Sequence, residues 1–135
     1  MISLKNIQKI DIQKMCVSYE KWPQLAREAY ENKIELLDLK NIDHFIFAGM
    51  GGSGALGDVF NSIMSKTNTH VSVIKGYKLP KTLDENTLVI STSVSGNTQE
   101  TLSILKQVKK ISAKSISFSS NGKIEKYCLQ NNLEC

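Results

Sequence analysis

Short apolar runs separated by amphipathic segments make up most of the chain after residue 43. Four runs have the length and the β-branched or aromatic content of buried strands, at residues 44–49, 71–74, 87–92 and 115–119. Segments with apolar positions at helical spacing follow at about 54–65, 98–110 and 123–131. Strands that alternate with helices of this length predict βαβ units and therefore a parallel sheet of the α/β class with helices on both faces.

The first 40 residues carry apolar and charged positions at helical spacing, without a strand-like run. Trp22-Pro23 interrupts this pattern, and proline is favoured in the first turn of a helix. One short and one longer helix are expected. Their apolar faces would be formed by Ile7, Ile10 and Met15, and by Leu25, Ala29 and Leu36. The sequence thus predicts an N-terminal helical segment over 1–40 and a domain over 41–135.

Composition narrows the function classes. The chain has 135 residues, 41% hydrophobic and 22% charged, which is ordinary for one globular domain. A net charge of +4 with scattered lysines argues against nucleic-acid binding, and the lack of an 18-residue apolar run argues against a membrane span. Three widely spaced cysteines without a CxxC motif favour a reduced, cytoplasmic setting and argue against a metal site.

Five glycines in nine residues follow the first apolar run, in the segment 49–57, with Ser53 among them. The segment lies between a predicted strand end and a predicted helix start. Glycines at such a place let backbone N–H groups approach an anion closely. The first expectation is therefore a phosphate-binding loop.

The loop after the third apolar run, residues 91–98, has serine or threonine at five of its eight positions. If the first and third strands are neighbours, as in the order 2-1-3-4, this loop and the glycine segment meet beyond the carboxyl ends of the strands. Hydroxyls and the N–H groups of the next helix suit a phosphate, although no Lys or Arg lies in the loop. Asn97 and Glu100 have the N-x-x-E spacing of a capping box, which favours capping over direct chemistry for Glu100.

A nucleotide is the competing ligand class. Gly49, Gly51 and Gly54 spell G-x-G-x-x-G, which taken alone is a weak dinucleotide signal. The second strand ends in Ile74-Lys75-Gly76, without the acidic residue that binds the ribose of NAD. An NADP-dependent protein stays as an alternative that leaves the hydroxyl-rich loop unexplained. The P-loop motif GxxxxGK[ST] is absent from the sequence.

The two motifs together, GMGGSGALGD and then SVSGNTQETL, resemble a sugar isomerase (SIS) domain. The Gly-Gly-Ser of the first motif is most similar to the N-terminal SIS domain of bifunctional phosphoglucose/phosphomannose isomerases. The resemblance covers about residues 20–131 and implies a flavodoxin-like sheet that binds a phosphorylated hexose without a cofactor or metal. The sugar contacts that it implies are Gly52 and Ser53, and the phosphate contacts are Ser93, Ser95 and Thr98. Gly51 is a further candidate for substrate binding, and Asn97 and Glu100 are candidate accessory residues.

The same resemblance implies a homodimer, and it places the catalytic Glu, His and Lys in a second SIS domain that lies outside this sequence. The alternation also stops where a fifth strand is due, so the chain reads as truncated. His44 and His70 directly precede strands and are expected at the surface of the amino end of the sheet, away from the ligand. Asp58 is expected to be solvated or paired within its helix.

No catalytic residue is therefore assigned. The chain is expected to bind the phosphosugar of an isomerase that interconverts glucose 6-phosphate or mannose 6-phosphate with fructose 6-phosphate, with little activity of its own. A stand-alone SIS sensor that regulates a partner is the alternative.

Overall fold

The structure is a computed structural model that describes residues 3–33 and 39–135. The chain divides into two compact units, residues 1–38 and residues 39–135.

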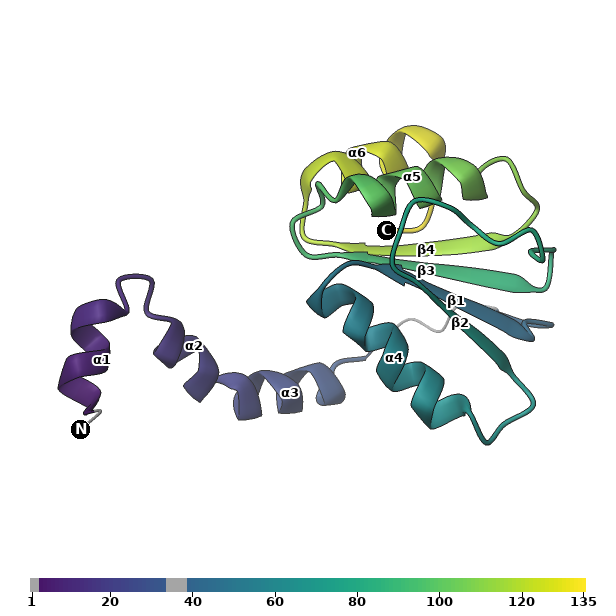
Figure 1. Ribbon diagram of the computed structural model, residues 1–135. Coiled ribbons are helices and arrows are strands. Elements are labelled where there is room, and N and C mark those ends of the chain that lie inside the picture. Colours follow the sequence, from purple (N-terminus) through teal and green to yellow (C-terminus); the bar gives the residue numbers. More distant parts are fainter. Residues whose placement is uncertain (1–2, 34–38) are drawn as a thin grey trace. The chain divides into compact units, whose positions relative to one another are not determined.

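Three helices form the described part of the first unit: α1 (Leu4–Ile10), α2 (Met15–Glu20) and α3 (Trp22–Glu31) (Figure 1). The expectation of two helices was wrong. Lys14 adopts a left-handed backbone conformation, and the Asp11 carboxylate accepts the N–H groups of Met15 and Cys16 at 2.7 and 2.8 Å. These contacts end one helix and start another. The predicted proline start is confirmed, because Pro23 lies in the first turn of α3.

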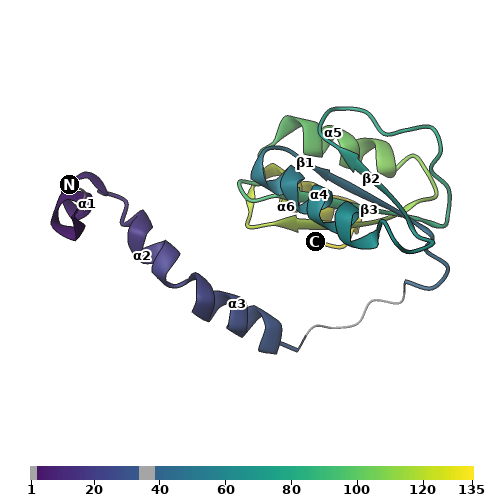
Figure 2. The same cartoon turned by 60° about the horizontal axis from the view of Figure 1, so that its bottom comes forward.

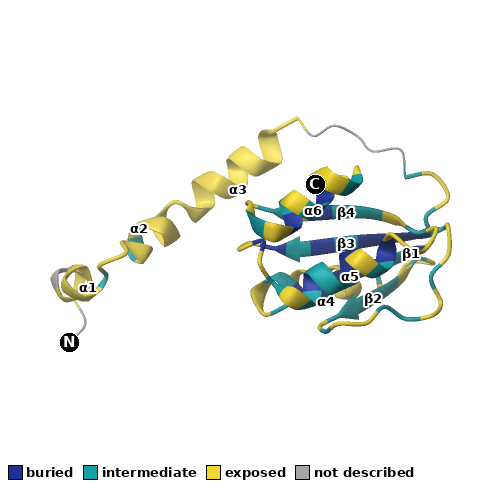
Figure 3. Ribbon diagram, turned by 90° about the horizontal axis from the view of Figure 1, so that it is seen from above, coloured by how far each residue is buried: buried dark blue, intermediate teal, exposed yellow. Residues whose placement is uncertain are grey.

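None of the described side chains of α2 and α3 is buried, and Figure 3 accordingly shows no dark blue on either helix. Trp22, Leu25 and Tyr30 are exposed on α3. Of the predicted apolar faces, Leu36 lies outside the described residues.

The second unit contains a four-stranded parallel sheet in the order β2-β1-β3-β4, as predicted. Its elements are β1 (His44–Gly49), α4 (Gly52–Met64), β2 (His70–Ile74), β3 (Thr87–Ser93), α5 (Gln99–Val108), β4 (Lys114–Ser119) and α6 (Gly122–Asn131). All four predicted strands and all three helices are confirmed, with small differences at their ends.

Helices cover both faces of this sheet. Helix α4 packs on β1 and β2, whereas α5 and α6 lie together on the opposite face, as Figures 1 and 2 show from two directions. Under α5 lies the main core, which consists of Ile46, Ala48, Val89, Ile104 and Val108. Burying side chains of the size of Ile and Val contributes about 1.5–3 kcal/mol each. This core fixes α5 over the central strands and so fixes where α5 begins.

The last residues of the chain return to the sheet. Glu134 pairs in parallel with Ile116 of β4, and its carbonyl oxygen accepts the Ser117 N–H at 2.9 Å. The segment after α6 therefore lies where the predicted fifth strand belongs, on the outer edge of β4.

Candidate functional site

The two motif-bearing loops lie side by side at the carboxyl end of the sheet. Strands β1 and β3 are hydrogen-bonded neighbours whose last residues are in register, with Gly49 opposite Thr92. A Cβ atom at Gly49 would lie 3.1 Å from the Thr92 carbonyl oxygen and 3.0 Å from the Ser53 backbone. The glycine allows this close approach. The expectation that the loops meet is confirmed.

The glycine loop leads directly into α4. Gly51 has a positive φ of 55°, favourable only for glycine, and it precedes a helix start with no side-chain cap. A Cβ at Gly54 would stand 2.6 Å from the Gly49 carbonyl oxygen, so the first turn of α4 packs tightly on the end of β1. Gly52 is exposed and Ser53 is half-buried in this turn. The first N–H groups of α4 thus face the loop without a capping side chain.

The loop between β3 and α5 brings together the predicted phosphate contacts. Ser93 is buried, and its hydroxyl oxygen lies 2.8 Å from that of Thr98. Ser95 is exposed, and its hydroxyl accepts the Asn97 N–H at 3.3 Å. Thr98 is the N-cap residue of α5, with no hydrogen bond from its side chain to the helix. The first N–H groups of α5 are therefore uncapped as well.

The expected capping box of Asn97 and Glu100 was wrong. The Asn97 amide donates to the Ser95 carbonyl oxygen at 2.9 Å, and its side-chain oxygen accepts the Lys123 N–H at 3.3 Å. Glu100 instead accepts a hydrogen bond from the Tyr77 hydroxyl, and this carboxylate raises the pKa of Tyr77. Contacts with distant parts of the chain have replaced the local cap.

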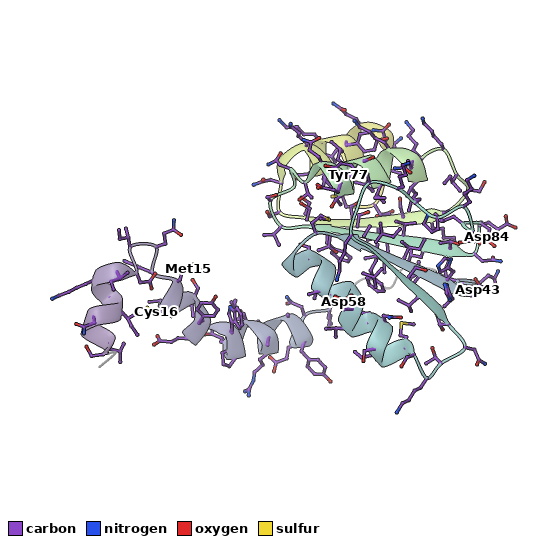
Figure 4. All side chains as sticks on the ribbon, viewed as in Figure 1. Met15, Cys16, Asp43, Asp58, Tyr77 and Asp84 are labelled. Atoms are coloured by element: carbon purple, nitrogen blue, oxygen red, sulfur yellow. The ribbon has the colours of Figure 1, made fainter. Side chains whose placement is uncertain are left out.

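Glu100 helps to attach the connection after β2 to α5. The Tyr77 carbonyl oxygen accepts hydrogen bonds from the side chains of Gln107, at 2.6 Å, and Ser103, at 3.1 Å. Tyr77 is labelled beside α5 in Figure 4. Gln107 and Ser103 thus hold the Tyr77 backbone on α5, and the Tyr77 hydroxyl is the partner of Glu100 at the edge of the site.

A cation next to the glycine loop was missed from the sequence. Lys75 follows β2 directly, and its ammonium lies 2.6 Å from the carboxylate of Asp58 on α4. The Lys75 side chain passes close to Gly54, where a Cβ would lie 3.2 Å from its Cε. The expectation that Asp58 is solvated is confirmed, because its side chain is exposed, but its ion-pair partner lies after β2 and not within its own helix. The position of Lys75 at a strand's carboxyl end was the signal that could have found it.

The histidines lie at the amino end of the sheet, as predicted, but His44 is buried and not on the surface. Ser72 stands between the two rings, with its hydroxyl 3.0 Å from His44 Nε2 and 3.2 Å from His70 Nε2. Burial, and secondly the neighbouring His70, lowers the pKa of His44. A whole strand separates this pair from the loops of the candidate site.

The site carries unsatisfied polar groups below its surface. Within residues 39–135, the buried hydroxyls of Ser91, Thr101 and Ser117 have no hydrogen-bond partner. Ser91 and Ser117 are register partners on β3 and β4, and Thr101 lies in the first turn of α5. Among the residues that the structure describes, no group of three or more His, Cys, Asp or Glu could hold a metal ion. No described helix is long and apolar enough to cross a membrane.

Uncapped N–H groups at two adjacent helix starts are an arrangement suited to anions, because each helix start carries about half a positive charge. Hydroxyls from Ser53, Ser93, Ser95 and Thr98 stand in or next to these helix starts. The arrangement can bind a phosphate and offer hydrogen bonds to an attached polar group.

Several known proteins are similar to this chain in sequence. The bifunctional phosphoglucose/phosphomannose isomerase of Caldicellulosiruptor bescii is 35% identical over 109 residues, which cover 78% of this chain and 32% of the relative. The enzyme of the same name from Thermoplasma acidophilum is 40% identical over 81 residues, which cover 60% of this chain and 26% of the relative. A D-glucosamine-6-phosphate 4-epimerase of Sulfolobus acidocaldarius is 31% identical over 108 residues, covering 79% and 33%. The chain thus spans about a third of the length of the curated relatives that it matches.

A crystal structure from Salmonella typhimurium, of a protein assigned as a phosphosugar isomerase, superposes with a TM-score of 0.54 and 25% identity. The match covers 64% of this chain and 28% of that one. The family model of the SIS domain matches residues 38–128, which include both loops. This chain therefore belongs to the SIS domain family.

Proposed function

We propose that residues 39–135 bind a phosphorylated hexose across the ends of β1 and β3. In this proposal the domain is the first half of an isomerase that interconverts glucose 6-phosphate or mannose 6-phosphate with fructose 6-phosphate. The observation that carries the proposal is the pair of uncapped helix starts on adjacent loops. The names of the relatives support the substrate class, because they describe enzymes that act on phosphorylated hexoses.

The phosphate lies on the hydroxyl loop in this proposal. Ser95 is exposed for a direct contact, while the bonded hydroxyls of Ser93 and Thr98 lie next to the start of α5. The sugar lies against Gly51, Gly52 and Ser53, where missing side chains leave room. A Cβ at Gly51 or Gly52 would have no atom within 4 Å, which is consistent with open space above this part of the loop.

We assign no catalytic residue. Aldose–ketose isomerisation needs a base that moves a proton between two carbons and an acid that opens the ring. Glu100 is the carboxylate in the first turn of α5, but it is bonded to Tyr77 and a bound phosphate beside it would repel its charge. We propose that the chain binds the phosphosugar with little isomerase activity of its own.

The relatives' names favour this enzyme hypothesis over a stand-alone sensor, and the SIS match leaves the NADP hypothesis without support. We further propose a cytoplasmic homodimer. The family resemblance supports the dimer, and the free thiols of Cys16, Cys128 and Cys135 are consistent with a reducing compartment.

Replacing Ser95 by alanine tests the proposal. Ser95→Ala should weaken binding of fructose 6-phosphate by about 1.5–3 kcal/mol, the range for a hydrogen bond to a charged group. Binding of unphosphorylated fructose should not change. Isothermal titration of both ligands measures the difference. Ser65→Ala is the matched control, because Ser65 is likewise an exposed serine but lies at the far end of α4, where its hydroxyl donates to the Ser62 carbonyl oxygen. Equal losses for the two ligands would show that the phosphate is placed wrongly.

A further inference from the structure

The loop after β4 touches the hydroxyl loop through two glycines. Gly96 and Gly122 have positive φ angles of 64° and 92°. A Cβ at Gly96 would stand 1.5 Å from the Asn121 carbonyl oxygen, and one at Gly122 would stand 2.9 Å from the Gly96 carbonyl group. The two backbones are in contact, and neither position has room for a side chain.

Hydrogen bonds join the same two loops. The Ile124 N–H donates to the Gly96 carbonyl oxygen at 2.9 Å, and the Ser120 hydroxyl donates to the Val94 carbonyl oxygen. The Lys123 N–H donates to the side-chain oxygen of Asn97 at 3.3 Å. Helix α6 therefore directs its first N–H groups at the hydroxyl loop, whereas the starts of α4 and α5 have no side-chain cap.

Asn97 connects this contact to the residue proposed to bind phosphate. Its backbone N–H donates to the Ser95 hydroxyl at 3.3 Å, and its side-chain amide donates to the Ser95 carbonyl oxygen at 2.9 Å. The side-chain oxygen of Asn97 accepts the Lys123 backbone N–H. One side chain thus fixes Ser95 relative to the start of α6, directly before the N-cap residue of α5.

We infer that the segment 119–123, which contains the end of β4, the connection and the start of α6, positions the hydroxyl loop for phosphate, with Asn97 and Gly122 as positioning residues. The ligand named here rests on the proposed function. The contact between the loops does not, so the two can fail separately. A bound phosphate needs several donors within hydrogen-bond distance at once, and a loop held from behind keeps them there before the ligand arrives.

Two substitutions in the full chain test this role. Asn97→Ala removes the amide bridge, and Gly122→Ala places a methyl group against Gly96. Each should weaken binding of fructose 6-phosphate by about tenfold: Asn97→Ala because one or two hydrogen bonds are lost, and Gly122→Ala because its methyl group displaces the hydroxyl loop. Each should also accelerate amide hydrogen exchange at residues 96–98. Gly76→Ala is the matched control, because a Cβ at Gly76 would have no atom within 4 Å.

A conservative variant separates positioning from folding. Asn97→Asp keeps a side-chain oxygen that accepts the Lys123 N–H, but it loses the side-chain amide that donates to the Ser95 carbonyl oxygen. In Asn97→Asp the Lys123 amide hydrogen should still exchange slowly, whereas in Asn97→Ala it should exchange faster. If Asn97→Ala lowers only the melting temperature, with unchanged affinity and unchanged exchange at residues 96–98, the inference is wrong. If the unmodified chain does not bind fructose 6-phosphate, the proposed function fails, and the exchange data still decide whether the loops are coupled.

Discussion

The two ends of the same sheet differ in how completely their polar groups are paired. At the amino end, near Asp43 and Asp84 in Figure 4, polar side chains bond to one another. Ser72 lies between the two histidine rings, and Thr87 both donates to the Asp84 carboxylate, at 3.0 Å, and accepts the Asp84 N–H, at 3.2 Å. At the carboxyl end, the starts of α4 and α5 have no side-chain cap.

The difference identifies the carboxyl end as the less stabilised end of the sheet. A missing N-cap costs about 1 kcal/mol. The buried hydroxyls of Ser91 on β3, Ser117 on β4 and Thr101 in the first turn of α5 are unsatisfied as well. An amino end with paired groups shows that this chain can satisfy polar groups elsewhere. We interpret the uncapped N–H groups at the starts of α4 and α5 as hydrogen-bond donors that remain available to a ligand.

The largest effect is expected from glycines within the carboxyl end. Gly96→Ala should cost about 3 kcal/mol or more, because its Cβ would meet a backbone oxygen at a left-handed position. Gly51→Ala has the same kind of backbone strain in open space and should cost only about 1 kcal/mol. Chemical denaturation measures both. Equal costs would mean that the contact between the loops after β3 and β4 does not constrain the fold.

A pair of threonines compares the two ends directly. Thr87 and Thr101 are both buried, but Thr87 is hydrogen-bonded to Asp84 and Thr101 has no partner. Thr87→Val should lower the free energy of unfolding by about 1–3 kcal/mol, because it leaves the Asp84 N–H without its acceptor. Thr101→Val should be neutral or stabilising by up to about 1 kcal/mol. The same sign and size for both variants would remove the proposed contrast between the ends.

The smallest effect concerns pH at the amino end. Burial, and then His70, lowers the pKa of His44, while Asp84 and Asp43 act in the opposite direction. The unfolded chain therefore binds the proton of His44 more tightly than the folded chain. Its contribution to stability is complete above the unfolded pKa of about 6.5 and is lost as the pH falls toward the folded pKa.

Urea denaturation at about pH 7.5 and pH 5.5 should thus show a smaller stability loss on acidification for His44→Gln than for the unmodified chain. An identical loss in both proteins would assign the acid sensitivity to other groups.

The regular part of this fold could be predicted from the sequence because local patterns determine it. The four apolar runs give the strands. The resemblance of the two loops to a SIS domain implies a flavodoxin-like sheet, in whose order 2-1-3-4 the two loops meet, as the structure confirms. The errors concern contacts made over long sequence separations. Asn97 and Lys123 are 26 residues apart, and Asp58 and Lys75 are 17 apart, so no local motif revealed them.

Two further errors have the same origin. The spacing of Asn97 and Glu100 fits a capping box, but in the structure Asn97 accepts the Lys123 N–H and Glu100 interacts with the Tyr77 hydroxyl. His44 was expected at the surface because it begins a strand, but β1 is a central strand and His70 packs on its ring, with centroids 4.5 Å apart.

We propose that the open N–H groups at the carboxyl end bind a phosphosugar. Addition of fructose 6-phosphate to the isotope-labelled chain, followed by amide chemical shifts, tests it most directly. We expect the amide signals of residues 51–54 and 95–101 to shift and those of His44 and His70 to stay unchanged. Inorganic phosphate should reproduce the shifts at 95–101 alone. Shifts confined to the amino end, or none at either loop at saturating ligand, would contradict it.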